Sequence, residues 1–268
     1  MKDMKIGCIG IGVMGSALME AVIRPAGASS VSVSDPDRDK RDAFCQRTGC
    51  TGSPGNAHLA ETSDILFLAV KPQYLDPVLA EIAPALRPDT VIVSMAAGIC
   101  IARLNSGLGG HQKIIRIMPN TPASVGSGMT ALAASVAVDE ETVNLVMHLL
   151  SPSGLVEKTP EHLMDAVTAV SGSGPAYGYL FIDALADAAV CMGLPRAQAI
   201  RYAAQTLKGA AEMVLETGKH PAELKDSVCS PAGTTIAAVA ALEEHGFRNA
   251  VIQAALAARD RSVELGKK

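Results

Sequence analysis

The sequence predicts an α/β protein in which a doubly wound parallel sheet is followed by an all-helical domain. Three observations predict this. Short runs rich in Val and Ile alternate with segments of helical period through the first part of the chain. From about Pro160 onward, Ala-rich helical segments separated by Gly, Pro and Ser replace the strand-like runs. The length of 268 residues suits two domains, which we place at residues 1–160 and 161–268.

The strands of the first domain are expected to be buried on both faces, because their runs contain few charged residues. Helices connect them, and strand–helix alternation is typical of parallel sheets. The strands are expected at Lys5–Ile9, Ser30–Ser34, Asp64–Val70, Thr90–Met95 and Lys113–Met118, with further strand-like pieces at Met129–Ala133 and Leu155–Lys158. The helices are expected at Val13–Ile23, Asp37–Thr48, Tyr74–Leu86, Ile101–Leu108 and Glu140–Leu150.

The second domain is expected to be helical throughout. Gly193 and Gly218 end helical segments, and Pro195 and Pro221 begin the next ones. Trp is absent and aromatic residues make up only 3% of the chain, so small aliphatic side chains must form the core. We expect such helices to need a partner chain to bury enough surface. The helical segments are 161–170, 176–194, 195–218, 220–228 and 234–267.

The composition excludes several classes of protein. A net charge of −4 and a pI near 5.9 give no reason to expect binding to nucleic acid or to an anionic membrane. No apolar run reaches the roughly 18 residues of a membrane-spanning helix. The N-terminus shows no signal-peptide pattern, so we expect a cytoplasmic protein. The six cysteines form no CxxC and have no histidine cluster beside them, which predicts buried free thiols and no metal site.

The clearest motif is "IGCIGIGVMG", in which Gly10, Gly12 and Gly15 form GxGxxG between a predicted strand and a predicted helix. The first glycine permits a tight turn, the second lets a pyrophosphate approach, and the third lets helix and strand pack closely. The free N–H groups of the helix start suit phosphates. The motif predicts a Rossmann-type dinucleotide site; the alternative is a tight turn in a sheet without a ligand.

The end of the second predicted strand, Ser34–Arg38, has three interpretations. Asp35 lies 20 residues beyond Gly15, where an acidic residue accepts hydrogen bonds from the adenosine ribose and favours NAD. Arg38 or the Ser34 hydroxyl would instead meet the 2′-phosphate of NADP. The third interpretation is that Asp35-Pro36-Asp37 caps the next helix. From these residues alone the three stay open.

Further loops are expected at the carboxyl ends of the strands, where ligands bind in open α/β sheets. Lys71 in "AVKPQ" is either a general acid or, more plainly, a solvated or ribose-contacting lysine. The small residues of "MAAG" (95–98) leave room for a nicotinamide ring, although close packing explains them equally well. Asn120 in "IMPNTPASVGSG" suits either a site wall or an ordinary turn.

Two polar loops interrupt the helical domain. "VSGSGPAY" (170–177) places Ser173 and two glycines before a helix, where uncovered N–H groups suit a carboxylate; a hinge is the alternative. "VCSPAGTTI" (228–236) contains three hydroxyl residues but no acid or base, and is either a helix–helix turn or the floor of a site. The hydroxyl residues of this second loop are Ser230, Thr234 and Thr235.

The motifs together resemble a known family. "GxGxMG", "AVKP", "MPNTP", "SGSGPAY", "GLPR", "ETGKHPAELKDSVCSPAGTTI" and "LEEHGFRNAVI" occur in this order, from about residue 5 to residue 265. The chain closely resembles pyrroline-5-carboxylate reductase. It departs from the family at Val13, where many members have Asn, and at Ala232, which replaces the first glycine of Ser-Pro-Gly-Gly.

The resemblance implies NAD(P)H-dependent reduction of L-1-pyrroline-5-carboxylate to L-proline, the last step of proline biosynthesis. It implies NADPH as coenzyme, with NADH as the alternative. It also implies a homodimer with intertwined helical domains, in some members assembled into decamers, and active sites that include loops of the partner chain. By motif match, Thr235 would hydrogen-bond the ring nitrogen, while Ser230, Gly233 and Thr234 shape a carboxylate pocket.

The expected site therefore has three sets of residues. Thr235 and Ser230 are the catalytic candidates, and no metal ligands are expected. The substrate set is Ser230, Gly233, Thr234, Thr235, Asn120 and Ser173. The coenzyme set is Gly10, Gly12, Val13, Met14, Gly15, Ser34, Asp35, Asn56, Ala69, Val70, Lys71, Pro72, Ala97, Gly98 and Asn120.

Two other functions are weaker interpretations. A 3-hydroxyacid dehydrogenase would need a lysine on a helix of the second domain, and Lys208 is the candidate, but its surroundings do not resemble that family's lysine motif. A dinucleotide sensor without catalysis would have no need of the "SPAGTTI" loop.

Overall fold

The computed structural model describes residues 4–266, and they form two compact units. The first unit contains the described residues up to Ser173 together with the segment from Ala258 onward. The second unit is Gly174–Ala257. The chain thus leaves the first unit, forms the second, and returns to the first.

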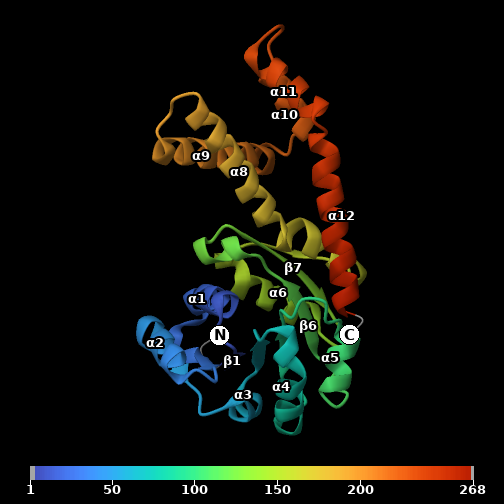
Figure 1. Ribbon diagram of the computed structural model, residues 1–268. Helices are drawn as coiled ribbons and strands as arrows, with labels where there is room; N and C mark the ends of the chain where they lie inside the picture. The colour runs from blue at the N-terminus through green and yellow to red at the C-terminus, as the bar shows by residue number, and fades with distance from the viewer. Residues whose placement is uncertain (1–3, 267–268) are drawn as a thin grey trace. The chain divides into compact units, whose positions relative to one another are not determined.

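The first unit is built on one eight-stranded sheet with the order β3-β2-β1-β4-β5-β6-β7-β8 (Figure 1). The strands β1 to β6 are mutually parallel, β7 runs antiparallel to β6, and β8 is parallel to β7. This order reverses direction between β1 and β4, which makes the sheet doubly wound, as predicted. The strands are β1 Ile6–Ile9, β2 Val31–Ser34, β3 Thr51–Gly52, β4 Ile65–Leu68, β5 Val91–Ser94, β6 Ile114–Met118, β7 Gly128–Ala134 and β8 Gly154–Lys158.

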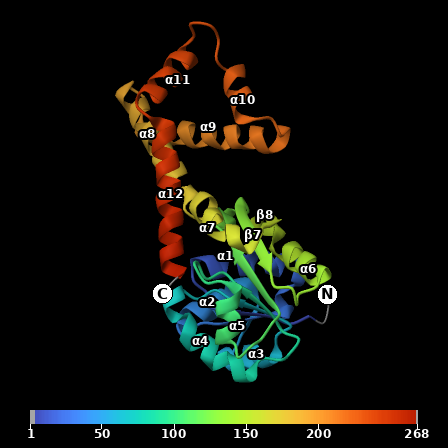
Figure 2. The same cartoon turned by 90° about the vertical axis from the view of Figure 1, so that its right-hand side faces the viewer.

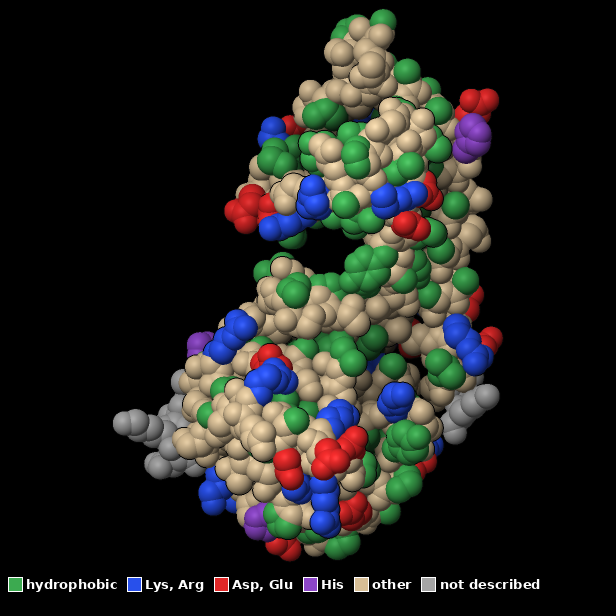
Figure 3. All heavy atoms as spheres, turned by 60° about the vertical axis from the view of Figure 1, so that its left-hand side comes forward, with side chains coloured by type: hydrophobic (Ala, Val, Ile, Leu, Met, Phe, Trp, Pro, Cys, Tyr) green, Lys and Arg blue, Asp and Glu red, His purple; other side chains and the backbone are tan. Residues whose placement is uncertain are grey.

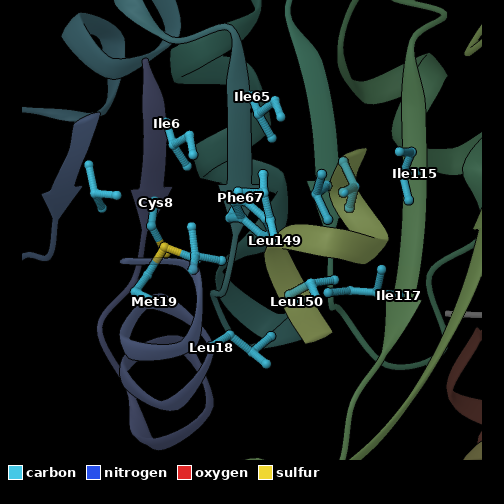
Figure 4. Packing of buried hydrophobic residues seen from close by; sticks show 14 of the residues in the cluster. Ile6, Cys8, Leu18, Met19, Ile65, Phe67, Ile115, Ile117, Leu149 and Leu150 are labelled. Atoms are coloured by element: carbon cyan, nitrogen blue, oxygen red, sulfur yellow. The ribbon is translucent and has the colours of Figure 1, made fainter. Parts of the chain in front are cut away.

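Helices cover both faces of the sheet, and each face has its own apolar core. One cluster joins α1, α2 and α6 to the sheet, and a second joins α3, α4 and α5. In the first cluster, Leu149 and Leu150 of α6 lie with Phe67, Ile115 and Ile117 of the strands (Figure 4). The α-helices of this unit are α1 Val13–Ala26, α2 Arg38–Thr48, α3 Asn56–Thr62, α4 Leu75–Ile82, α5 Ile101–Gly107, α6 Glu140–Leu150 and α7 Met164–Val167.

Short helical turns connect these elements. The predicted helix over 74–86 is interrupted, because Pro84 lacks the N–H that α4 would need to continue beyond Ile82. A π-helical turn at Thr168–Gly172 leads into the second unit. The 3₁₀ turns are η1 Ala28–Ser30, η2 Pro72–Tyr74, η3 Ala83–Ala85, η4 Thr121–Val125, η5 Ser151–Ser153 and η6 Glu161–Leu163.

The second unit consists of helices, as predicted, and has very little core of its own. Within residues 174–257 the buried side chains are those of Ala186, Ala199 and Ala203, where α8 packs against α9 (Figure 2). The last predicted segment is two helices, because Gly246 adopts a φ of +71° and breaks it. The helices are α8 Gly174–Cys191, α9 Arg196–Thr217, α10 Pro221–Ser227, α11 Thr234–Glu244 and α12 Phe247–Gly266, whose last turns belong to the first unit.

The cysteines only partly follow the sequence-based prediction. All six are free thiols, and Cys8 and Cys50 are buried. The prediction of burial is wrong for Cys100 and Cys191, which are exposed. Burial and the neighbouring Cys50 raise the pKa of the Cys45 thiol to about 11, so this thiol stays protonated at neutral pH.

We expect Phe67→Ala to lower the free energy of unfolding by about 3–5 kcal/mol, because Phe67 is 0% exposed and its removal leaves a cavity. Urea denaturation measures the change. Val136→Ala is the control: this side chain is fully exposed, so the substitution should change stability by less than about 0.5 kcal/mol. Equal effects of the two substitutions would contradict this account of the core.

Candidate functional site

The glycine-rich loop lies between β1 and α1 at the carboxyl edge of the sheet. Gly10 has a φ of +95°, and a Cβ there would lie 2.8 Å from the Ala69 carbonyl oxygen. A Cβ on Gly15 would overlap the Gly10 carbonyl oxygen. At Gly12, the N-cap of α1, no neighbouring atom of the described residues lies within 4 Å of an added Cβ. Two of the glycines therefore permit close packing, and the third leaves open space at the helix start.

A pocket of about 620 Å³ opens beside this loop. Eight of the predicted coenzyme residues line it, from Gly10 to Lys71, whereas the other seven do not. Its wall also includes Arg38, which the sequence analysis named as one possible contact of a 2′-phosphate. Lys40, Arg41 and residues of α4 line it as well, and the sequence-based prediction did not include them. The lining residues are Ile9, Gly10, Gly12, Ser34, Asp35, Pro36, Arg38, Lys40, Arg41, Ser53, Pro54, Gly55, Asn56, Ala69, Val70, Lys71, Tyr74, Pro77, Val78 and Glu81.

Asp35 follows β2 and is bound to its surroundings. Its Oδ2 accepts hydrogen bonds from the Ile11 N–H at 2.7 Å and from the Lys40 ammonium at 3.2 Å. Its Oδ1 accepts one from the Asp37 N–H at 3.0 Å. Asp37 itself caps α2, since its carboxylate accepts a hydrogen bond from the Lys40 N–H. The capping interpretation of this segment is thus confirmed for Asp37.

Ser34 and Asn56, which also line the pocket, bind each other. The Ser34 hydroxyl donates to Asn56 Oδ1 at 2.8 Å, and the Asn56 amide donates to Glu81 Oε2 at 2.7 Å. Both side chains are therefore oriented by neighbours, and Ser34 keeps its oxygen lone pairs as acceptors.

The pocket carries more positive than negative side chains. Arg41 donates to Asp42 and to the Ser53 carbonyl, and Lys40 binds Asp35. Arg38 is exposed, and within residues 4–266 its guanidinium has no hydrogen bond or ion pair. An unpaired guanidinium beside a glycine loop fits an anionic group such as a phosphate. The lined space, the open helix start and this charge fit a phosphorylated dinucleotide.

The loop between β5 and α5 lies at the same carboxyl edge of the sheet and contains Ala97 and Gly98. Gly98 has a φ of +76°, and a Cβ on Gly266 would lie 2.6 Å from its carbonyl oxygen. The end of α12 is also held by Ser262, whose hydroxyl donates to Asp165 at 2.6 Å. The last turn of the chain's final helix is therefore packed against this loop.

Asn120, which follows β6, binds other segments of the first unit. The Asn120 amide donates to the Ser171 carbonyl at 3.1 Å and lies 3.3 Å from the Ser171 hydroxyl. Its Oδ1 accepts a hydrogen bond from the Met129 N–H at 2.9 Å. The Asn120 side chain thus joins the turn after β6 to β7 and to the π-helical turn. Ser173 closes that turn by donating its N–H to the Thr168 carbonyl.

Residues outside the predicted set stabilise the first turn of α5. Glu161 accepts a hydrogen bond from the Ile101 N–H at 2.6 Å and lies 3.6 Å from the buried Arg116 guanidinium. Both are far from Ile101 in sequence, so no local pattern indicates the contact. By contrast, the basic residues Arg38, Lys40 and Arg41 form a visible run at the start of α2.

The polar loop of the second unit precedes α11. Gly233 is the N-cap, and its N–H donates to the Ser230 carbonyl at 3.0 Å. Among residues 4–266, no side chain caps α11, so the first N–H groups of this helix remain available to an anion. Ser230 and Thr234 are exposed and Thr235 is half-buried. Ala232 is the one non-glycine residue with positive φ among residues 4–266, at +55°, a conformation that favours the glycine typical of this position in the family.

Lys208 has the environment of an ordinary surface lysine. Its ammonium lies 3.4 Å from Glu212 one turn along the same helix, and its side chain is largely exposed. This contact gives no support to the 3-hydroxyacid dehydrogenase interpretation. Among residues 4–266, no group of three or more His, Cys, Asp or Glu side chains is placed to hold a metal ion, and no helix has the length and apolar character of a membrane span.

The fold and this pocket define a protein with a Rossmann-type dinucleotide-binding unit and a helical second part. Two family models match: "NADP oxidoreductase coenzyme F420-dependent" over residues 5–98, and "Pyrroline-5-carboxylate reductase dimerisation" over residues 161–265. The pyrroline-5-carboxylate reductase of Synechocystis sp. is 48% identical to this chain, and the match covers 99% of this chain and 100% of the Synechocystis protein. That of Escherichia coli is 45% identical, and the match covers 99% of each chain. The chain belongs to the pyrroline-5-carboxylate reductase family.

Solved structures agree with this assignment. Plasmodium falciparum pyrroline carboxylate reductase with NADP bound has a TM-score of 0.89 at 33% identity. The Coxiella burnetii pyrroline-5-carboxylate reductase has a TM-score of 0.92 at 34% identity. In both comparisons 99% of this chain and 99% of the other chain are covered.

We expect Gly12→Ala to weaken NADP⁺ binding by at least about tenfold, because its methyl group would enter the space a pyrophosphate needs. The substitution should leave the melting temperature within about 2 °C, since nothing lies near the added Cβ. Gly15→Ala should instead lower the melting temperature, because its Cβ overlaps the Gly10 carbonyl. Isothermal titration calorimetry and thermal denaturation separate the two effects; unchanged affinity in Gly12→Ala would remove this loop from the site.

Proposed function

We propose that this chain reduces L-1-pyrroline-5-carboxylate to L-proline with NADPH, the last step of proline biosynthesis. The observation that carries the proposal is the likeness to pyrroline-5-carboxylate reductases along the whole chain, at 48% identity over 269 residues for the Synechocystis protein. NADPH as coenzyme is supported by the NADP-bound Plasmodium structure and by the NADP oxidoreductase family over residues 5–98. NADH is the alternative coenzyme.

We propose that residues 1–160 bind the coenzyme and that residues 161–268 bind the substrate and form the dimer. In the first part, the residues proposed to meet the coenzyme, or to hold the loop that meets it, are the fifteen expected from the sequence. Eight of them share one pocket, and this supports the assignment. The 2′-phosphate is proposed to meet Arg38, whose guanidinium is exposed beside that pocket.

The chemistry asks little acid–base work of the protein. NADPH, when bound, supplies a hydride to the imine carbon of the substrate. The ring nitrogen is protonated before the transfer and becomes the neutral amine of proline, so the hydride transfer itself needs no proton from the protein; the amine then takes up a proton from water. The protein's task is to hold two planar reactants face to face and to fix the carboxylate. Positioning of this kind contributes up to roughly 7–11 kcal/mol.

The loop before α11 suits that task. Thr235 is proposed to hydrogen-bond the ring nitrogen, and Ser230, Gly233 and Thr234 to surround the carboxylate. The uncapped start of α11 supports this, because free N–H groups and the positive end of the helix dipole attract an anion. Asn120 and Ser173 stay proposals as substrate contacts; in this structure the Asn120 amide is bound to Ser171 and Met129.

A homodimer is proposed from the dimerisation family and from the surface of the second unit. Its buried residues are three alanines, whereas large apolar side chains are exposed on α8, α9 and α12. Figure 3 shows hydrophobic side chains at the surface in the upper part of the view, where the second unit lies. Covering them with a second copy would supply the missing burial. Decamers and a cytoplasmic location stay predictions.

The activity is tested by mixing the purified protein with pyrroline-5-carboxylate and NADPH or NADH in parallel and following coenzyme oxidation. Consumption of NADPH with formation of proline is the expected result. Absence of turnover with both coenzymes would refute the proposal.

We expect Thr235→Ala to lower kcat/KM for pyrroline-5-carboxylate by about 10–100-fold, because a hydrogen bond to a charged group is lost. The affinity for NADP⁺ should change by less than about twofold. Thr235→Ser keeps the hydroxyl and should restore most of the rate. Wild-type kcat/KM in Thr235→Ala would remove Thr235 from the assigned role.

We expect Arg38→Ala to raise the KM for NADPH about tenfold while the KM for NADH stays within about twofold, since only NADPH carries the 2′-phosphate. Arg24→Ala is the control, because Arg24 is an exposed arginine of α1 outside the pocket. Steady-state kinetics with each coenzyme provides the measurement. Equal losses with both coenzymes would assign the phosphate to another residue.

A further inference from the structure

Asp35 occupies a position that conflicts with the proposed use of NADPH. An acidic residue at the end of the second strand of a Rossmann domain binds the ribose hydroxyls of NAD, and its charge opposes a 2′-phosphate. This chain has such a residue, yet it belongs to a family in which an NADP-bound structure is known. The contacts of Asp35 resolve the conflict.

The Asp35 carboxylate is occupied by donors of its own chain. Its side chain is 8% exposed and accepts three hydrogen bonds, two on Oδ2 and one on Oδ1. A carboxylate offers about four acceptor positions, two on each oxygen. One position on Oδ1 is left, whereas a ribose diol offers two hydroxyl groups. The carboxylate is therefore poorly placed to hold a ribose through both oxygens.

The same contacts attach the glycine loop to the sheet. Ile11 lies between Gly10 and Gly12, and its N–H donates to Asp35 at 2.7 Å. One residue earlier, the Gly10 N–H donates to the Ser34 carbonyl at 2.8 Å. Two consecutive N–H groups of the loop are thus bound to the end of β2, and the second of these bonds depends on the Asp35 side chain.

The charge of Asp35 is compensated where it lies. The Lys40 ammonium, 3.2 Å from Oδ2, pairs with it, and the Ile11 N–H adds a dipole directed at the same oxygen. Lys40 comes from the first turn of α2, next to Arg38, whose guanidinium has no partner within the described part of the chain. A 2′-phosphate at this edge would meet the Arg38 guanidinium and a carboxylate that is already paired with Lys40.

We propose that Asp35 is a positioning residue, which holds the glycine loop through Ile11 and binds Lys40, and that it does not select the coenzyme through the ribose. This inference rests on the proposed function for the identity of the coenzyme. It applies to both coenzymes alike, since the loop receives the pyrophosphate that NADPH and NADH share.

Two substitutions test the proposal, with binding of NADP⁺ and NAD⁺ measured by titration calorimetry in the absence of substrate. Asp35→Ala removes the acceptor of the Ile11 N–H and should weaken both coenzymes by a similar factor, about tenfold. Asp35→Asn keeps an oxygen that can accept from Ile11 and should keep both affinities within about threefold of wild type. Rescue by Asn is the signature of a positioning role.

Asp39→Asn is the matched control. Asp39 is exposed in the same turn of α2, and within residues 4–266 its carboxylate makes no hydrogen bond or ion pair. The Asp39→Asn substitution removes the same negative charge without changing a contact of the glycine loop, so it should leave the affinities for NADP⁺ and NAD⁺ unchanged. Thermal denaturation of the protein without coenzyme should show Asp35→Ala less stable than Asp35→Asn, because only the alanine variant leaves the loop N–H without a partner.

A selective change would overturn the proposal. If Asp35→Asn shifted the ratio of NADP⁺ to NAD⁺ affinity by about tenfold or more, Asp35 would contact the ribose or repel the phosphate directly. Loss of both affinities in Asp35→Asn as large as in Asp35→Ala would equally contradict it. The wild-type protein separates failure of this proposal from failure of the proposed function. If the wild-type protein bound neither NADP⁺ nor NAD⁺, the proposed function would be refuted, whatever the variants do.

Discussion

The first unit depends on the close approach of three backbone segments at the carboxyl edge of its sheet. Gly10 lies against the Ala69 carbonyl after β4, Gly15 brings α1 down onto the Gly10 carbonyl, and Asp35 ties the loop between them to β2. No side chain larger than hydrogen fits at the two glycines. The helix start, the pocket and its basic wall all take their places from this contact. The coenzyme chemistry therefore rests on packing distances between main-chain atoms, with few side chains involved.

Much of this fold could be predicted from the sequence, because β-branched runs buried on both faces have an unmistakable composition. The strand at Ile114–Met118 and the helix at Glu140–Leu150 lie where the pattern places them. The two-residue strand β3 was not predicted, since an element this short shows no periodicity, and the helix α3 was not predicted either. The antiparallel direction of β7 is equally invisible in composition, because it depends on how the chain turns at Thr121–Val125.

The loops that form the candidate site could be predicted from the sequence. Glycine spacing, strand ends and the hydroxyl-rich loop indicate where a dinucleotide and a small acid would bind. They do not indicate which way a polar side chain turns. The sequence does not show that the Asp35 carboxylate binds its own backbone, and the structure reveals this contact with the Ile11 N–H. Glu161 and Ile101 are likewise 60 residues apart, so a hydrogen bond between them follows from tertiary structure alone.

The return of α12 to the first unit has a consequence for how the protein is made. Ser262 and Gly266 complete contacts with Asp165 and Gly98, yet they are translated after every residue of the intervening helices. During synthesis the sheet and its helices can assemble early, in keeping with the usual order in which domains fold on the ribosome. The segment that packs on the Gly98 loop is synthesised after them. A nascent chain thus completes its nucleotide-binding unit only after the helices of the second unit have been synthesised.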